Sequence, residues 1–438
     1  MKIWWIALVI KLTLSAIFPL SQDEAYYWVW SKYLQLSYFD HPGMVAWLFW
    51  LGHFLESFGQ AVRWPSVILG HLTLLVWIFI LDEIIPKDKL KEKSRFWLWL
   101  ALSSPMLGFG SLLSTPDVPV VFFWSLSAWL IGKILSEQKI RDYIFLGIAL
   151  GLGFCSKYHI VLFVFSLLIW LIFERRWKAL STKGIFLTTF FGFLFSLPVL
   201  IWNFQNGFQS FRFQLDHGLG SNQWEPFWTY SYLLAQLLLL APVTIWSAFR
   251  AQLPSKFSFL RYLAWVPFVF FLFSSLKGVV EVNWPIVAFP AMYALAVLGA
   301  SPLRQLWWSI LPWAAIALFV TAQTLYPFTD NLPERIQETH YFDPILLLPK
   351  TYSPMYYGSY QMASRVWWAQ KTPTKKLFQC NRHDFFDEIQ GVPAEEKHFY
   401  VAKETWVDWP KWLMNSQYQL SKIQDVPPKF ELYEVTKK

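Results

Sequence analysis

The stretch LSQDEAYYWVWSKYLQLSYFDHPGMVAW, residues 20–47, follows an apolar segment, residues 3–20, that is long enough to cross a bilayer. Four of its ionisable side chains stand among a dense run of Tyr and Trp: Asp23, Glu24, Asp40 and His41. Such groups are costly in hydrocarbon, and a plain surface loop does not need so many aromatic residues. The stretch therefore predicts a specialised segment at the mouth of a membrane helix.

The composition is that of a membrane protein. The 438 residues are 55% hydrophobic and 15% charged, whereas an average soluble chain is about 25% charged. The 20% aromatic content suits belts at both lipid–water interfaces. The net charge of +8 comes from short loops between apolar segments, where it sets orientation, so no nucleic-acid partner is expected.

Hydropathy predicts a polytopic α-helical membrane protein with about eleven transmembrane helices. The expected spans are 3–20, 62–85, 96–113, 118–135, 142–156, 159–174, 185–202, 226–247, 259–276, 285–299 and 306–326. Loops on the side of the N-terminus carry 17 Lys and Arg, against 4 on the opposite side, or 5 with Arg63. The positive-inside rule then places the N-terminus in the cytoplasm and the tail outside.

Two domains are predicted, a membrane domain over residues 1–326 and a tail over 327–438. The tail loses the apolar runs and gains charge and proline, and its segments KHFYVAKE (397–404) and KFELYEVTKK (429–438) are typical of short strands. We expect a small extracytoplasmic α/β domain. Cys155 and Cys380 lie far apart and suggest no disulfide framework.

Polar chemistry is concentrated in the predicted outer loops. These segments are DEAYYW and YFDHP (23–42), STPD (114–117), SKYH (156–159), NFQNGFQSFRFQLDHG (203–218) and KGVVEVNWP (277–285). Taken singly, Asp23-Glu24 or Asp117 could cap a helix, Lys157 could reach toward the interface, and His217 could be structural. Together they predict a cavity at one membrane face that holds an anion and a proton acceptor.

At these residues the sequence resembles the membrane glycosyltransferases of the GT-C fold that use polyprenyl-phosphate sugars. The nearest branch includes the bacterial relatives of protein O-mannosyltransferases and the lipid A aminoarabinose and galacturonic acid transferases. The matching strings, in order, are DEAYYWVWS, YFDHPG, STPDVPVVFFW, GLGFCSKYHIVL, SFRFQLDHG and EVNWPIVAFPAM. They span about residues 23 to 292, and the tail adds no recognisable motif.

The resemblance implies that residues 21–61 form amphipathic helices on the outer membrane face, with Trp and Tyr at headgroup depth. Two positions depart from the family pattern. Pro42-Gly43 stands where the family commonly has Pro-Pro, and His41 stands where the aminoarabinose branch commonly has lysine.

The implied reaction moves a sugar from a polyprenyl-phosphate donor to an acceptor hydroxyl or amine. Asp23, by its match to the family's first-loop acid, is the candidate general base, and Glu24 and Asp117 would bind the sugar or position the acceptor. The remaining candidates for the donor phosphate and substrate are Asp40, His41, Lys157, Arg212, His217, Glu281 and Asn283. Expected partners are the lipid-linked sugar, membrane lipid, and a glycan, lipid A-like lipid or protein acceptor.

Two other functions stay open at this point. A transporter or flippase of a lipid-linked sugar would use the same charges, although alternating access calls for polar groups toward both faces. An assembly factor would not depend on Asp23. No cofactor is required, and a divalent metal held by Asp, Glu and His is an alternative that no ligand spacing supports. The sugar, the acceptor and the lipid length are not encoded in any recognisable pattern.

Overall fold

The computed structural model describes residues 2–219, 223–329, 340–391, 396–414 and 417–438, without the side chains of 217–219. The chain forms two compact units. The first contains Met1–Ile17 and Gln35–Ala322, and the second contains Phe18–Leu34 and Gln323–Lys438. The helix of the opening stretch thus clusters with the tail, whereas the sequence predicted a tail unit of residues 327–438 alone.

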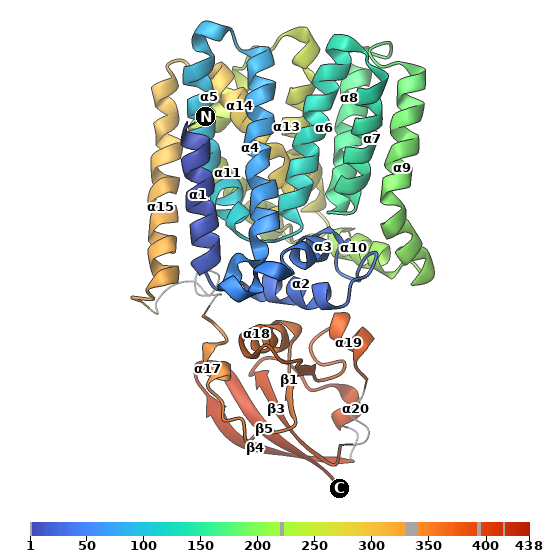
Figure 1. Cartoon of the computed structure of the whole chain (residues 1–438), viewed down its shortest axis with the longest axis vertical. Helices are drawn as coiled ribbons and strands as arrows, with labels where there is room; N and C mark the ends of the chain where they lie inside the picture. The colour runs from blue at the N-terminus through green and yellow to red at the C-terminus, as the bar shows by residue number, and fades with distance from the viewer. Residues whose placement is uncertain (1, 220–222, 330–339, 392–395, 415–416) are drawn as a thin grey trace. The chain divides into compact units, whose positions relative to one another are not determined.

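The first unit is a bundle of apolar helices (Figure 1). Its α-helices are α1 (Lys2–Ile17), α3 (Met44–Leu51), α4 (Trp64–Ile84), α5 (Lys87–Ser103), α6 (Asp117–Glu137), α7 (Ile140–Phe154), α8 (Val161–Phe173), α9 (Thr182–Gln205), α10 (Gln209–Leu219), α11 (Pro226–Leu240), α12 (Pro242–Phe249), α13 (Phe259–Ser274), α14 (Phe289–Gly299) and α15 (Trp307–Leu325). Short helical turns join them: η1 (His53–Arg63), η2 (Pro105–Phe109), η3 (Gly110–Leu112), η4 (Tyr158–Ile160), η5 (Ser255–Phe257), η6 (Trp284–Ala288) and η7 (Leu303–Leu306).

The chain is a polytopic helical membrane protein. Among the described residues, 5 helices are long and apolar enough to cross a membrane, or up to 7 if each of two bent helix pairs is one span. Two shorter apolar helices, Tyr158–Phe173 and Trp284–Gly299, add to these. Each of the expected spans coincides with a helix or a joined helix pair, but helix breaks leave several of them shorter than the roughly 20 residues of a straight span.

Glycine lets two of these helices approach closely. A Cβ atom on Gly151 of α7 would lie 2.7 Å from the carbonyl oxygen of Gly192 in α9, and one on Gly147 would lie 2.5 Å from that of Thr188. Small residues at helix interfaces allow this backbone approach in membranes, where packing rather than the hydrophobic effect drives association. The contact fixes the C-terminal end of α7, from which the site begins.

The second unit holds a mixed β-sheet. Its strands are β1 (Met355–Tyr357), β2 (Lys375–Lys376), β3 (His398–Glu404), β4 (Tyr418–Val426) and β5 (Phe430–Lys437), in the order β2-β1-β3-β5-β4. β1 pairs in parallel with β2 and β3, whereas β5 pairs antiparallel with β3 and β4. The two strands predicted from sequence are confirmed as β3 and β5, which are direct neighbours. The helices are α2 (Gln22–Lys32), α17 (Asp343–Leu346), α18 (Tyr360–Gln370), α19 (Phe385–Ile389) and α20 (Lys411–Met414).

The aromatic run of α2 corrects the expectation that these residues lie at headgroup depth. Tyr26 lies with its ring centroid 4.3 Å from that of Tyr360, and Trp28 lies 5.0 Å from Trp368 in the same way. The backbone N–H of Phe385 donates to the Tyr26 hydroxyl at 2.8 Å. The residues of α2 from Glu24 to Ser31 are all buried. The aromatic side chains of α2 therefore form a protein core with α18 and α19.

Candidate functional site

Three polar loop segments of the first unit come together in the structure. Asp117 lies at the start of α6, Lys157 follows the end of α7, and Asn283 precedes η6. The Lys157 Nζ donates to Asp117 Oδ1 at 2.7 Å, and the Asn283 Nδ2 donates to Asp117 Oδ2 at 2.6 Å. Three loops separated by 40 to 166 residues along the chain therefore share one carboxylate.

Burial makes this cluster unlike a surface ion pair. The side chains of Lys157 and Asp117 are 9% and 11% exposed. Exposed ion pairs contribute little to folding stability. A buried ion pair is favourable only if further hydrogen bonds satisfy its remaining donors and acceptors. Asn283 supplies that further bond. The cluster is thus a fixed polar centre within the helix bundle.

The two structural explanations that the sequence left open for these residues do not hold. Pro116 is the N-cap of α6, and the side chain of Asp117 makes no cap hydrogen bond. Lys157 is buried in the ion pair instead of reaching toward an interface. Both side chains make contacts between loops.

A second set of contacts joins the loop between α2 and α3 to α9, α10 and the end of α7. The Trp202 Nε1 donates to Gln35 Oε1 at 2.7 Å, and the Gln214 Nε2 donates to the backbone oxygen of Asp40 at 2.7 Å. The backbone N–H of Met44 donates to the carbonyl oxygen of Cys155 at 3.0 Å. These bonds connect YFDHP and the α10 segment with the loop that carries Lys157.

The remaining predicted residues are placed as follows. Asp40 is buried and His41 is half-buried in the first outer loop. Arg212 is exposed on α10, and Glu281 is exposed in the loop before η6. His217 falls in α10, but its side chain lies outside the described residues.

Asp23 and Glu24 belong to the second unit, in the first turn of α2. Ser21 is the N-cap, and its Oγ accepts from the Glu24 N–H at 3.3 Å while the Ser21 N–H donates to Glu24 Oε2 at 3.0 Å. This reciprocal pair is a capping box. Glu24 is fully buried and serves the cap, whereas Asp23 is half-buried in the same turn.

Sequence reasoning missed the hydroxyl and amide groups around Tyr158 and the lysine in α1. The Tyr158 hydroxyl lies 2.8 Å from Ser210 Oγ, and Asn203 Nδ2 lies 3.5 Å from it. Lys11 is buried in α1 and donates to Ser111 Oγ at 2.5 Å. A lysine inside an apolar span is itself a signal of function, and it could have identified Lys11.

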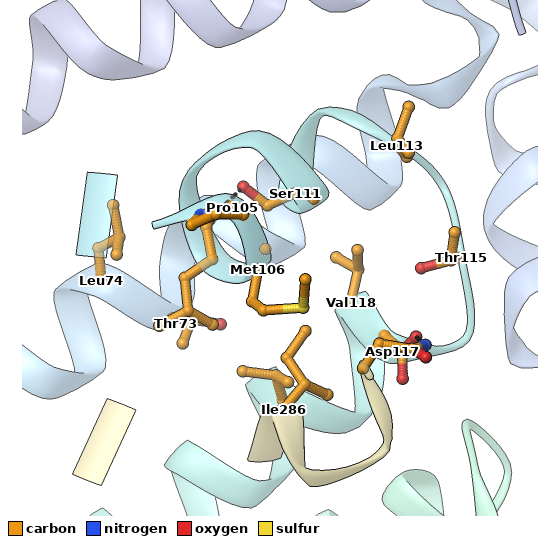
Figure 2. Close-up of a pocket in the computed structure, with 15 residues that line it drawn as sticks. Thr73, Leu74, Pro105, Met106, Ser111, Leu113, Thr115, Asp117, Val118 and Ile286 are labelled. Carbon is orange, nitrogen blue, oxygen red and sulfur yellow. Dashed lines mark hydrogen bonds between the residues drawn. The ribbon is translucent and has the colours of Figure 1, made fainter. Parts of the chain in front are cut away.

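Three cavities lie in the first unit, and one of them adjoins the polar cluster (Figure 2). One of about 180 Å³ is lined by Asp117 and Asn283. A second, of about 610 Å³, includes Tyr158 and His159, and a third, of about 480 Å³, lies among apolar residues of α7, α8 and α9. Among the described residues no three His, Cys, Asp or Glu side chains gather as metal ligands.

Comparison with known proteins shows what the chain is similar to. Residues 40–202 match the family of dolichyl-phosphate-mannose-protein mannosyltransferases, a segment that includes Asp117 and Lys157. The matched segment is similar to this family and covers 163 of the 438 residues. The family match does not include Asp23 or Asn283.

Curated proteins similar to this chain include two kinds of sugar transferase. The undecaprenyl phosphate-alpha-4-amino-4-deoxy-L-arabinose arabinosyl transferase of Edwardsiella ictaluri is 28% identical over 64% of this chain and 52% of its own length. The lipid A galacturonosyltransferase RgtD of Rhizobium johnstonii is 24% identical over 72% of this chain and 67% of its own. The chain thus spans about half the length of the arabinosyl transferase.

A solved structure shares the fold. The structure of ArnT from Cupriavidus metallidurans bound to undecaprenyl phosphate matches with a TM-score of 0.65 and 14% identity, over 98% of this chain and 96% of that one. The apo structure of the same protein gives a TM-score of 0.69. At this identity the likeness establishes the architecture of the chain.

Proposed function

We propose that this protein transfers a sugar from a polyprenyl-phosphate donor, with undecaprenyl phosphate as the carrier, to an acceptor at the outer face of the cytoplasmic membrane. The acceptor is a lipid A-like lipid, a glycan or a protein. The observation that carries the proposal is the buried cluster of Asp117, Lys157 and Asn283 at the point where the outer loops meet. The family match and the relatives that act on lipid A or carry undecaprenyl phosphate in their names support it.

In the proposed reaction the acceptor oxygen or nitrogen attacks the anomeric carbon as the bond from that carbon to the phosphate oxygen breaks. The configuration inverts, the acceptor proton passes to a carboxylate, and the lipid phosphate leaves with the bonding electrons. Asp23 is our candidate for the base. Glu24 acts through the cap that holds the first turn of α2.

The charge that develops on the departing phosphate requires cations or hydrogen-bond donors. Lys157 is already neutralised by Asp117, so the cluster is a positioning centre with no net charge. We assign Arg212 and His217 on α10 to the phosphate, with Asp40, His41 and Glu281 around the same opening. The apolar cavities beside Tyr158 and along α7 to α9 suit a polyprenyl chain.

The proposed topology has about eleven membrane crossings, a cytoplasmic N-terminus and an extracytoplasmic sheet domain. Crossings shorter than the usual ~20 residues are accommodated where neighbouring helices cover their ends. The asymmetry of Lys and Arg between the two sets of loops supports this orientation.

The deciding experiment measures transfer by the purified protein with undecaprenyl-phosphate-linked sugars and lipid A, with products identified by mass spectrometry. We expect a glycosylated lipid and free undecaprenyl phosphate in equal amounts. Arg212→Ala should lower turnover about tenfold to hundredfold, as loss of a charge-assisted phosphate contact does. Lys277→Ala, an exposed cation of the same loop face, is the matched control. Donor crossing the membrane without transfer would instead establish the flippase.

A further inference from the structure

A histidine contacts the end of α15. Thr324 lies in the last turn of this helix, and the Nε2 atom of His340 lies 3.1 Å from the Thr324 carbonyl oxygen. The last carbonyl groups of a helix have no partner within the helix, and the C-terminus of a helix favours a positive charge. His340 therefore occupies the place of a cationic cap on α15.

Both ring nitrogens of His340 face hydrogen-bond acceptors. The Nδ1 atom lies 2.9 Å from Oδ2 of Asp343 in α17, and Nε2 faces the Thr324 carbonyl oxygen. A carbonyl oxygen and an ionised carboxylate accept hydrogen bonds and cannot donate them. A neutral imidazole has a single N–H group, so only the imidazolium ion can donate to both acceptors. The two contacts thus favour the charged form of His340.

Asp343 connects His340 to a buried arginine. Arg365 of α18 is 5% exposed, its Nη2 lies 3.7 Å from Asp343 Oδ1, and its Nη1 donates to the Leu20 carbonyl oxygen at 2.7 Å. Leu20 directly precedes Ser21, the N-cap of α2. A chain of contacts therefore runs from the end of α15 to the start of α2, and all its members belong to the second unit.

The start of α2 is the part of this chain that bears on sugar transfer. Asp23, the proposed general base, lies in the first turn of α2, three residues after Leu20. Leu20 is fully buried, and the bond from Arg365 to its carbonyl oxygen crosses 345 residues of sequence. Arg365 thus fixes the backbone from which the first turn of α2 begins.

We propose that His340, Asp343 and Arg365, which we call the His340 network, position Asp23 for catalysis, and that loss of the His340 proton weakens this positioning. The proposal rests on the proposed function for the role of Asp23, whereas the network itself is a property of the second unit. Its members are positioning residues, because they act through Leu20 and the first turn of α2. A neutral His340 keeps one N–H group and releases either Asp343 or the Thr324 carbonyl.

The charges around His340 give the direction of the pH dependence. The hydrogen bond to Asp343 raises the pKa of His340 above its usual value, and this outweighs the opposing effects of burial and Arg365. Asp343 and Arg365 are the charged groups that act on the ring within the described part of the chain. A raised pKa in the folded protein gives stability that is complete below about pH 6.5 and is lost as the pH rises through the raised value. The network is therefore intact in acid and weakens as the medium becomes alkaline.

The first test measures the network directly in the full-length protein in detergent. Nuclear magnetic resonance of ¹⁵N-labelled histidine should show one ring, absent in His340→Gln, that titrates above about pH 6.5. The amides of Glu24 and Ala25 are bonded to Ser21 and report on the first turn of α2. After correction for the intrinsic effect of pH, their hydrogen exchange should be slower at about pH 6 than at about pH 9. His340→Gln, which does not titrate, should exchange faster than the wild type at the lower pH and show no such difference.

The second test measures positioning through turnover. We expect His340→Gln to lower kcat about threefold to tenfold at about pH 6, with little change in the KM for the donor, because one partly exposed charged hydrogen bond is lost. The decline of kcat that accompanies deprotonation of His340 in the wild type should be absent from the variant. Arg365→Gln should speed exchange in the same turn at both pH values and lower kcat. His398→Gln is the matched control, since His398 also pairs with a carboxylate of the second unit, Glu434, at 2.7 Å.

The two tests separate the possible failures. A His340 ring that titrates at or below about pH 6.5, or exchange near Ser21 that His340→Gln leaves unchanged, overturns the network. A His340 variant with fast exchange but normal kcat and an unchanged pH profile overturns the effect on Asp23. If the wild type transfers no sugar at any pH, the proposed function and the role for Asp23 both fail, and the titration and the exchange still decide whether the network exists.

Discussion

Asp117 is held by two partners from distant loops, and this makes it the residue whose replacement is most informative. Its oxygens accept from Lys157 and Asn283 at 2.7 and 2.6 Å. With both oxygens engaged by donors from other loops, the carboxylate anchors those loops to α6. We therefore treat Asp117 as a positioning residue and keep Asp23 as the candidate base.

Asp117→Asn should destabilise the protein by about 3–5 kcal/mol, because Lys157 is then left buried without its counter-charge. Lys157→Met should lower the free energy of unfolding by a similar amount. The double variant should recover much of that free energy. Thermal unfolding in detergent measures the three values as a double-mutant cycle. If the double variant also regains wild-type transfer, the cluster has only a structural role.

Asp23→Asn should leave the protein folded and reduce transfer about 10²- to 10⁴-fold, the usual contribution of a general base. Ser21 caps α2 and Glu24 completes the capping box, so the exchange leaves the cap intact. Glu24→Gln is the matched control, since glutamine also completes a capping box. Turnover is measured per folded molecule. Normal transfer by the Asp23 variant would mean that another carboxylate is the general base.

At the scale of elements, α2 is placed by its aromatic residues. Tyr26 accepts the Phe385 N–H and packs on Tyr360, which fixes the first outer loop to α18 and α19 within one unit. From sequence alone, the same aromatic residues were equally consistent with a position at the lipid interface. Amphipathic aromatic residues serve both environments, so their pattern does not distinguish a membrane surface from a protein core.

Tyr26→Phe should weaken this connection by about 1–3 kcal/mol, because the buried Phe385 N–H loses its acceptor. Hydrogen exchange followed by mass spectrometry should show faster exchange in the peptide containing residues 385–389. Tyr230→Phe, at an exposed tyrosine of α11, controls for the general effect of removing a hydroxyl. Unchanged exchange in the Tyr26 variant would mean that ring packing alone holds α2.

At the scale of the whole molecule, the distribution of charge determines the orientation in the membrane. Reporter fusions near residues 90 and 180 should give cytoplasmic signals, and fusions near residues 215 and 380 should give extracytoplasmic ones. The reason is the excess of Lys and Arg in the first pair of loops. A cytoplasmic signal from the fusion near residue 380 would place every proposed site residue on the wrong side.

The sequence by itself determined the membrane class, the helical segments, the strands β3 and β5, and the loops that carry the polar residues. Hydropathy and charge act locally along the chain, so a single sequence reveals them. The approach of Asp117 to Lys157 and Asn283 was foreseen as a shared face, but not as a hydrogen-bonded cluster. Which partners a carboxylate takes depends on distances between loops that are far apart in sequence.

Only the tertiary structure decided which residues pack against α2 and which polar groups line the smallest cavity. Phe18–Leu34 joins a unit whose other part begins at Gln323, because the aromatic faces of α2 and α18 are complementary in three dimensions. Lys11 and Ser111 stand in separate apolar segments, and the sequence does not show that they meet. The Lys11 Nζ reaches Ser111 Oγ because α1 packs against η3, so the buried lysine gains a hydrogen bond.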